Sequence, residues 1–375
     1  MKNIKNALFI QGINVFAQGS LEVLLPLLLI ERNIRIEYIG LIFALGPIIF
    51  QLSRMVLAVI SDFFGRKKFF IINSILDPLS ILVYYFAVSP LGFAVGKIVD
   101  QLSSASFWSV NRAFLLEQGK DKKRNLVYMR IVDNISQASG RFIIGFLIVY
   151  IFFYNALLFL FVTSLFLIPF ALTVKDKVIK KKFNFTNVRG ILNLNNKKKD
   201  FKKFLLFYSF WGLSNGIIFT GYVIPLFLNS KNFSPEIIGV LLGVQLFIAG
   251  ITAYFIKKLR LRHILITSAI LYIIFISLLN FVNYYMLAIF IALLLGITIG
   301  FIYIGNEFMF SHITGKESYA TDLALAIVGF HAGRSISEAL AGFLIPSFGY
   351  ISVFLYSILT FLVFSIGSYT IFKDV

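Results

Sequence analysis

The sequence contains 375 residues, of which 59% are hydrophobic, 17% aromatic and only 14% charged. Soluble globular proteins contain about 45–50% apolar and about 25% charged residues, so this chain has too little polar surface for an aqueous fold. Disorder is excluded by the same numbers, because disordered chains have low hydrophobicity. Cysteine is absent, which excludes disulfide bonds, thiolate metal sites and cysteine nucleophiles. The composition therefore predicts an integral membrane protein.

Twelve apolar stretches are long enough to cross a bilayer as helices, which requires about 20 residues each. In chain order they are 7–30, 38–60, 69–89, 91–116, 126–152, 155–174, 204–228, 236–256, 264–282, 284–310, 321–345 and 350–372. Most connectors are short, so neighbouring spans are expected to run antiparallel. A β-barrel is not favoured, because its strands would appear as alternating segments of about ten residues.

Positive charges fall mainly on one side of this predicted topology. With the N-terminus inside, 26 of the 35 lysines and arginines lie in inner segments, and only Arg32, Arg35 and Lys231 lie in outer loops. Cytoplasmic loops of membrane proteins are enriched in these residues, so both termini are expected in the cytoplasm and the protein in the cell (plasma) membrane. The net charge of +18 is then a topology signal, and binding of nucleic acid is not expected.

The longest connector, 175–203, is basic and divides the chain into two halves of six spans, 1–174 and 204–375. Between 26–40 and 225–239, seven of fifteen positions are identical and in register. This repeat predicts an all-α membrane protein with twelve transmembrane helices in two six-helix, pseudo-symmetric bundles. Parallel repeats of this kind build transporters that bind substrate between their halves. Chance similarity between apolar segments is the alternative interpretation.

The loop after the second predicted span reads Ala58-Val-Ile-Ser-Asp-Phe-Phe-Gly-Arg-Lys-Lys68. It resembles the loop signature of the major facilitator superfamily, Gly-x-x-x-Asp-basic-x-Gly-basic-basic. The matching positions are Asp62, Gly65, Arg66 and Lys67, and the departures are Ala58 and Phe63. Together with the twelve spans, the basic central connector and the repeat, the resemblance extends over the whole chain.

The resemblance implies a cytoplasmic gate built around this loop. Asp62 would face the N-terminus of the eleventh span, where exposed N–H groups favour an anion, and Gly65 permits the turn. Arg66 would contact an acid at the inner end of the fourth span, where Glu117 matches. The proposed gate motif is Asp62, Gly65, Arg66, Lys67 and Glu117. The alternative is that its bases only set the topology.

Polar side chains recur at steps of three and four in the first, fourth, seventh and tenth spans, which places them on one face of each helix. The resemblance implies that these four spans surround a central substrate cavity. The candidate cavity residues, which include two arginines and a glutamate outside these spans, are Gln18, Lys97, Gln101, Trp108, Arg141, Trp211, Asn215, Tyr222, Asn306, Glu307, Arg334 and Glu338. The alternative is that polar contacts merely hold helices together.

Two arginines, Arg141 and Arg334, occupy matching places in the two halves. One hypothesis is that they hold an anionic group of the substrate from opposite sides. The other is that Asp133 and Glu338 neutralise them.

A charged side chain at the bilayer centre costs about 2.5–3.5 kcal/mol on insertion scales, so internal ion pairs are expected. An acid without a partner can carry a proton. Glu22 has no cation on its own span and is the first candidate for proton coupling, followed by Asp133 and Asp100. Asp77 precedes Pro78 and is interpreted as a partner for backbone groups that the proline frees.

These patterns predict a secondary active transporter that moves a small organic solute or drug-like compound by alternating access, with proton coupling. Uptake and efflux remain open, although the fifth span lacks the Gly-Pro run that antiporters of this superfamily often carry. Expected partners are the solute, protons or another coupling ion, and lipid; the chain is expected to be a monomer. No enzyme activity, metal or cofactor is expected. The alternative is a membrane enzyme or lipid-handling protein on a similar scaffold.

Overall fold

A computed structural model describes the chain at residues 2–118, 122–176, 199–219, 221–256, 259–313 and 319–373. Every secondary-structure element within these ranges is a helix. The first group of helices is α1 (Lys2–Glu31), α2 (Ile36–Phe64), α3 (Lys67–Phe86), α4 (Pro90–Gln118), α5 (Lys122–Leu165) and α6 (Leu167–Thr173). The second group is α8 (Lys199–Ile218), α9 (Val223–Ser230), α10 (Pro235–Ile256), α11 (Leu261–Leu279), α12 (Tyr285–Ile313) and α13 (Tyr319–Phe372).

The helices present an apolar outer surface. Within the described residues, nine segments are long and apolar enough to cross a membrane. Large hydrophobic side chains project outward along these segments, with exposed fractions of 60–82%: Leu52, Phe86, Phe255, Met286 and Phe348. A surface of this kind is stable in lipid and would aggregate in water. The chain is therefore a multi-pass, all-helical membrane protein.

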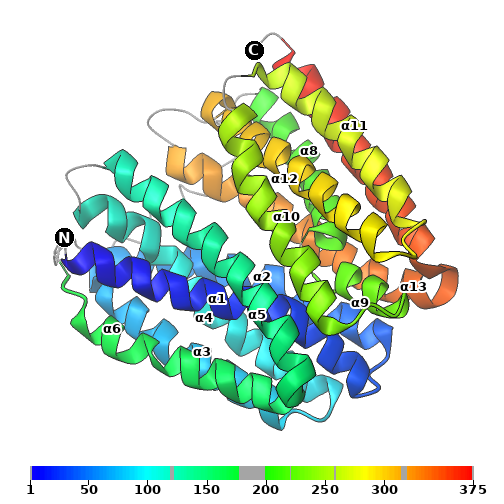
Figure 1. Cartoon of the computed structure of the whole chain (residues 1–375). Coiled ribbons are helices and arrows are strands. Elements are labelled where there is room, and N and C mark those ends of the chain that lie inside the picture. The colour runs from blue at the N-terminus through cyan, green and yellow to red at the C-terminus, as the bar shows by residue number, and fades with distance from the viewer. Residues whose placement is uncertain are drawn as a thin grey trace.

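Two helices change direction in their middle. α5 is interrupted at Phe152, with φ 64° and ψ 167°, and α13 at Gly349, with φ 73° and ψ 176°. Both interruptions coincide with sequence-predicted boundaries between spans, at 152–155 and 345–350. The chain then returns along the bundle, and Figure 1 shows α6 beside the start of α1 and the red end of α13 beside α11.

The seventh predicted span, 204–228, differs from the prediction because it is two helices and not one. α8 ends at Ile218, and α9 begins at Val223. Gly221, between them, has φ 132°, a conformation that residues with a side chain rarely adopt. A Cβ atom at this position would lie 2.8 Å from the backbone oxygen of Gly216. Glycine is therefore what allows the helix to break here.

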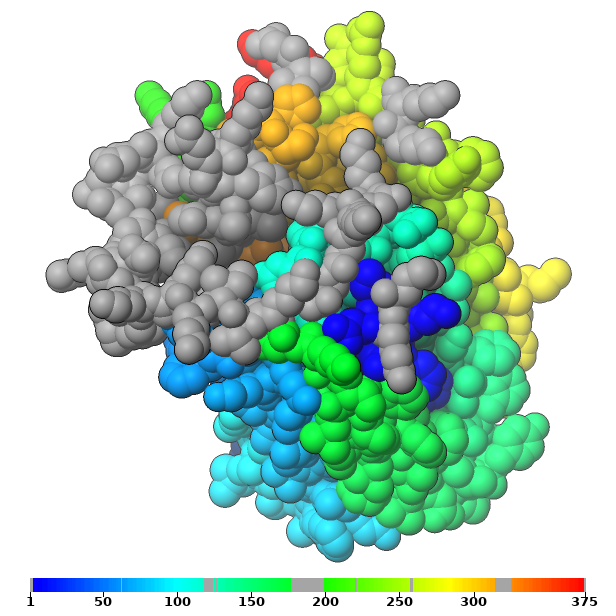
Figure 2. All heavy atoms as spheres, turned by 90° about the vertical axis from the view of Figure 1, so that its left-hand side faces the viewer, coloured from blue at the N-terminus to red at the C-terminus, as the bar shows by residue number. Residues whose placement is uncertain are grey.

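The two groups of helices lie side by side, and both termini are at the same end of the molecule (Figure 1). Figure 2 looks onto that end, where the blue start of α1 borders the green residues that follow α6. There Asn3 Nδ2 donates a hydrogen bond to the backbone oxygen of Lys175, 3.1 Å away.

The groups meet through two helix crossings, α2 with α13 and α5 with α10. At the first, a Cβ atom on Gly40 would lie 2.7 Å from the Cα of Gly342. At the second, a Cβ atom on Gly239 would lie 3.1 Å from the Cα of Gly145. Backbones therefore touch at both crossings, where a larger residue would push them apart. Gly40 and Gly239 occupy the same position of the sequence repeat, so the repeat supplies one glycine to each crossing.

Candidate functional site

A cavity of about 170 Å³ lies between the two groups of helices. α1, α2 and α4 line one side, and α13 and the break before α9 line the other. Its lining residues are Gln18, Leu21, Glu22, Phe43, Pro47, Phe50, Lys97, Asp100, Gln101, Ser104, Trp108, Gly221, His331 and Arg334. Pockets for drug-sized ligands have about 300–1,000 Å³, so this cavity matches a small solute.

The charged side chains of the cavity are paired with one another. Lys97 Nζ lies 3.1 Å from Asp100 Oδ2 and sits over the ring of Phe43, 5.1 Å from its centroid. Arg334 Nε donates to Glu338 Oε1 over 2.9 Å. Both pairs are three or four residues apart on one helix, as helix geometry allows. The cavity therefore presents polar groups with little unbalanced charge.

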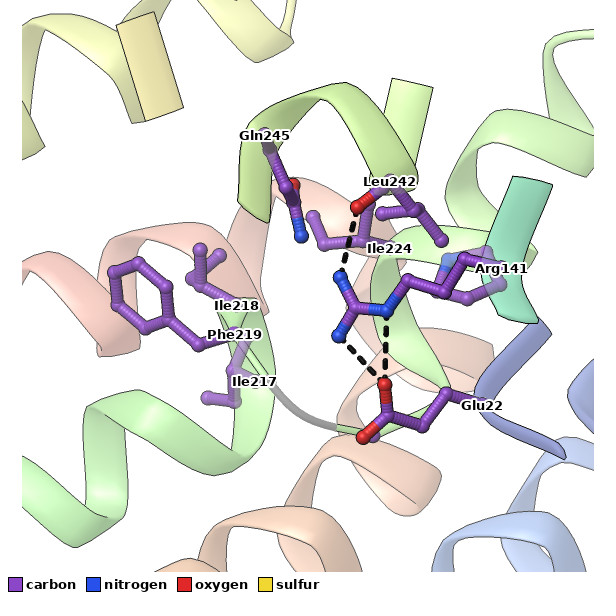
Figure 3. Close-up of a pocket in the computed structure, with 10 residues that line it drawn as sticks. Glu22, Arg141, Ile217, Ile218, Phe219, Ile224, Leu242 and Gln245 are labelled. Atoms are coloured by element: carbon purple, nitrogen blue, oxygen red, sulfur yellow. Dashed lines mark hydrogen bonds and ion pairs between the residues drawn. The ribbon is translucent and has the colours of Figure 1, made fainter. Parts of the chain in front are cut away.

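A third pair joins Glu22 of α1 to Arg141 of α5, and Arg141 also reaches the second helix group (Figure 3). Nε and Nη2 of Arg141 donate to Glu22 Oε2 over 2.9 and 2.5 Å. Nη1 donates to the backbone oxygen of Leu242 over 2.9 Å, and Gln137 Nε2 donates to both oxygens of Glu22 over 3.2 and 3.3 Å. The side chain of Arg141 is 3% exposed. It therefore ties α1 and α5 of the first group to α10 of the second.

This pair bears on two hypotheses from the sequence. Arg141 is neutralised, but by Glu22 of another helix and not by Asp133, while Arg334 is paired with Glu338 as the spacing suggested. Glu22 has no cation within its own predicted span, 7–30, yet α5 supplies one.

Asp133 belongs to another cluster of charged side chains, with Arg130 and Glu307. Its Oδ2 is 3.8 Å from Arg130 Nη1, and Gln11 Nε2 donates to its Oδ1 over 3.5 Å. Arg130 also reaches across to α12, where its Nη2 lies 3.2 Å from Glu307 Oε1. The side chains of Arg130 and Glu307 are 60% and 53% exposed, so this contact between the groups is only partly enclosed.

The remaining cavity candidates do not line the cavity. Trp211 is buried against the rings of Phe219 and Phe361, and the Tyr222 hydroxyl donates to the backbone oxygen of Glu338 over 2.9 Å. The others outside its lining are Arg141, Asn215, Asn306, Glu307 and Glu338. Of the predicted set, Gln18, Lys97, Gln101, Trp108 and Arg334 line it, together with Glu22 and Asp100 from the proton-coupling candidates.

Several residues that line the cavity were not predicted from the sequence. His331 packs against Phe50, with ring centroids 5.3 Å apart, and stands one turn before Arg334. The spacing of three could have placed His331 on the cavity face. Phe43, Phe50 and Gly221 carried no such signal, because aromatic and glycine residues are frequent in every apolar span. Among the described side chains, no group of three His, Asp or Glu is arranged to hold a metal ion.

The loop between α2 and α3 contacts other residues of the first helix group, at the end of the molecule where the termini lie. Arg66 Nη2 lies 3.1 Å from Glu117 Oε1 on α4, and Arg66 also donates to the Ser61 hydroxyl. Gly65 has φ 86°, and the backbone nitrogen of Lys67 donates to Asp176 Oδ2 over 3.1 Å. Asp176 was not predicted. The side chain of Asp62 and those at 319–324 lie outside the described part of the chain, as does the expected contact between them.

The chain is similar to known proteins in both sequence and fold. The family model described as Major Facilitator Superfamily matches residues 7–260. A search of curated proteins gives no significant match. Among solved structures, the nucleoside transporter NupG has a TM-score of 0.79 and 12% identity, with 100% of both chains covered.

Two further structures share the fold. A bacterial homolog of the human lysosomal transporter Spinster, solved inward-facing and unoccupied, has a TM-score of 0.76 and 12% identity over 99% of this chain and 97% of that one. The human organic anion transporter MFSD10 (TETRAN) has a TM-score of 0.66 and 13% identity over 98% of this chain and 99% of that one. At these identities the likeness establishes the fold.

Proposed function

We propose that this chain, which belongs to the Major Facilitator Superfamily, is a secondary active transporter that moves a small organic solute by alternating access. The observation that carries the proposal is the polar cavity between the two helix groups of a membrane protein. Charged and amide side chains are costly at membrane depth, so a water-accessible path is the simplest reason for their presence. The cavity lies where parallel-repeat transporters bind substrate.

The proposed topology has twelve crossings, with both termini in the cytoplasm and the protein in the plasma membrane. α5 with α6 supplies two crossings because of the interruption at Phe152, and α13 supplies two because of Gly349. α8 and α9 together supply one. Residues 1–174 and 204–375 then form two six-helix bundles joined by the basic connector 175–203.

The proposed substrate is a small, neutral, polar compound with a planar ring. The cations of the cavity are already paired, which disfavours a strongly charged solute. Trp108, Phe50 and His331 offer ring faces for stacking, and Gln18 and Gln101 offer amide hydrogen bonds. A nucleoside has this chemistry, and NupG, which shares the fold, is a nucleoside transporter. An organic anion is the second candidate because Arg334 lines the cavity and because MFSD10, which shares the fold, is an organic anion transporter.

Transport is tested by counterflow in proteoliposomes loaded with unlabelled nucleoside and exposed to radiolabelled nucleoside outside. A carrier is expected to exchange the label faster than it gives net flux, and Trp108→Ala and Gln101→Ala should each weaken the exchange. Glu31→Gln is the matched control, because Glu31 is exposed at the far end of α1. An organic anion run in parallel distinguishes the two substrate classes. Chemical conversion of the solute, without exchange, would favour the alternative of a membrane enzyme.

The driving force is tested with the same vesicles under an imposed pH gradient. Proton coupling predicts accumulation of the solute against its own gradient, in the direction of proton flow for uptake and against it for efflux. The same result with a sodium gradient and no pH gradient would instead identify another coupling ion.

A further inference from the structure

The buried acid Asp77 is not neutralised by any base among the described residues. Asp77, on α3, is 4% exposed, and its Oδ2 atom has no hydrogen-bond partner. Its Oδ1 receives only a long hydrogen bond, 3.5 Å, from Asn14 Nδ2 of α1. Within the described residues, no lysine or arginine forms an ion pair with it. By contrast, every other acid considered for proton coupling has a base within 4 Å: Arg141 for Glu22, Lys97 for Asp100 and Arg130 for Asp133.

The surroundings of Asp77 offer no compensating charge from any helix packed against it. α4 places Asp100 nearby, a like charge whose own partner is Lys97, together with the Ser103 hydroxyl. α1 contributes the amide of Asn14. The second part of α5, 153–165, and α6 contain no charged residue. Tyr84, on α3 itself, has a buried hydroxyl that makes no hydrogen bond. An isolated carboxylate in such a site costs several kcal/mol, a cost that one bound proton removes.

A chain of hydrogen bonds leads from Asp77 to the cavity. Gln18 lines the cavity, and its Nε2 donates to the Ser104 hydroxyl over 2.9 Å and to Asn14 Oδ1 over 3.0 Å. Asn14, which is fully buried, donates in turn to Asp77. An amide presents a donor on one side and an acceptor on the other, so Asn14 can donate to an ionised Asp77 or, turned over, accept from a protonated one.

We infer that Asp77 is a proton-binding site of this protein, connected to the substrate cavity through Asn14 and Gln18. A solute that binds the Gln18 amide draws it from Asn14, which frees Asn14 to turn and to accept the hydrogen bond of protonated Asp77. Loss of the solute lets Asn14 turn back and donate to the carboxylate, which favours release of the proton to water. The inference rests on the proposed proton coupling, and it assigns the proton to a residue other than the ion-paired Glu22.

The site is tested first without any solute, by infrared spectroscopy of the purified full-length protein as a function of pH. A protonated carboxyl gives a C=O band distinct from that of a carboxylate. We expect the wild type to show a protonated-carboxyl component that titrates with pH, that is lost in Asp77→Asn and that is retained in Glu22→Gln and Glu31→Gln. A component that persists in Asp77→Asn, or that disappears in Glu22→Gln, would overturn the assignment.

A second variant keeps the test valid if Asp77→Asn does not fold. Asn14→Ala removes the hydrogen bond from α1 to the carboxyl without touching Asp77, so the pH at which the component titrates should shift while its size is unchanged. An unshifted titration would show that Asn14 does not connect the site to the cavity.

The link to transport is tested separately, with a nucleoside in proteoliposomes. Asp77→Asn should abolish accumulation under a pH gradient but retain counterflow, and Glu31→Gln should retain both. If wild-type accumulation is proton-driven and Asp77→Asn still accumulates, this inference fails while the proposed function stands. If no variant transports but the infrared component behaves as expected, the proton site stands and the proposed function fails.

Discussion

Arg141 illustrates how much of this protein depends on single buried ion pairs. Its guanidinium contacts Glu22 on α1 and the Leu242 backbone oxygen on α10, so one side chain holds three helices. Removing one member of a buried pair leaves an uncompensated charge, which typically costs about 3–5 kcal/mol, whereas replacing both members is much less costly.

The Glu22–Arg141 pair predicts a strongly non-additive double-mutant cycle. Glu22→Gln and Arg141→Gln should each lower the apparent melting temperature of the purified protein, because each leaves its partner charged and buried. The double variant should be more stable than either single variant. Additive effects of the two substitutions would contradict a direct pairing.

Spacing along one helix explains some of these contacts and not others. Lys97 with Asp100 and Arg334 with Glu338 meet because residues three and four apart share a helix face. Glu22 with Arg141 requires knowledge of which helices are neighbours, which residue types in an apolar span do not reveal. The lack of an ion-pair partner for Asp77 could not be predicted for the same reason, because it depends on which helices surround α3.

At the scale of helices, apolar length predicted most of the fold because a bilayer requires little else of a helix. The turns at Phe152 and Gly349 fall at predicted boundaries. The break between α8 and α9 was missed, since the surrounding sequence is apolar and contains one weak sign, Gly221. A Cβ atom at Gly221 would lie 2.8 Å from the backbone oxygen of Gly216 and 3.2 Å from Glu338 Oε1, so the break depends on glycine at this position.

The glycine crossings predict a sharp position dependence for substitution by alanine. Gly40→Ala would place a Cβ 2.7 Å from Gly342 Cα, so we expect a loss of about 1–3 kcal/mol from overpacking. Gly12→Ala is the control, because its nearest neighbours would lie at ordinary contact distances of 3.4 and 3.6 Å. Alanine should stabilise that helix slightly. Thermal unfolding of both variants measures the difference; equal effects would contradict backbone contact at the crossing.

At the scale of the whole molecule, we propose that the α2–α3 loop forms part of the cytoplasmic gate. The Glu117 side chain is 37% exposed, and partly exposed ion pairs contribute about 0–1 kcal/mol to stability. Glu117→Gln should therefore leave the unfolding temperature nearly unchanged. It should nevertheless increase the rate at which a cysteine in the cavity is labelled from the cytoplasmic side. A large loss of stability with unchanged labelling would assign the pair a purely structural role.

Alternating access itself is tested most directly by placing a single cysteine in the cavity. The chain has no cysteine of its own, so Ser104→Cys carries the only thiol and lies on the cavity wall. A membrane-impermeant maleimide is applied to right-side-out and to inside-out vesicles, with the buried Ser268→Cys on α11 as control. The account predicts labelling of Ser104→Cys from each side and no labelling of the control. Labelling from one side alone, or from neither, would contradict it.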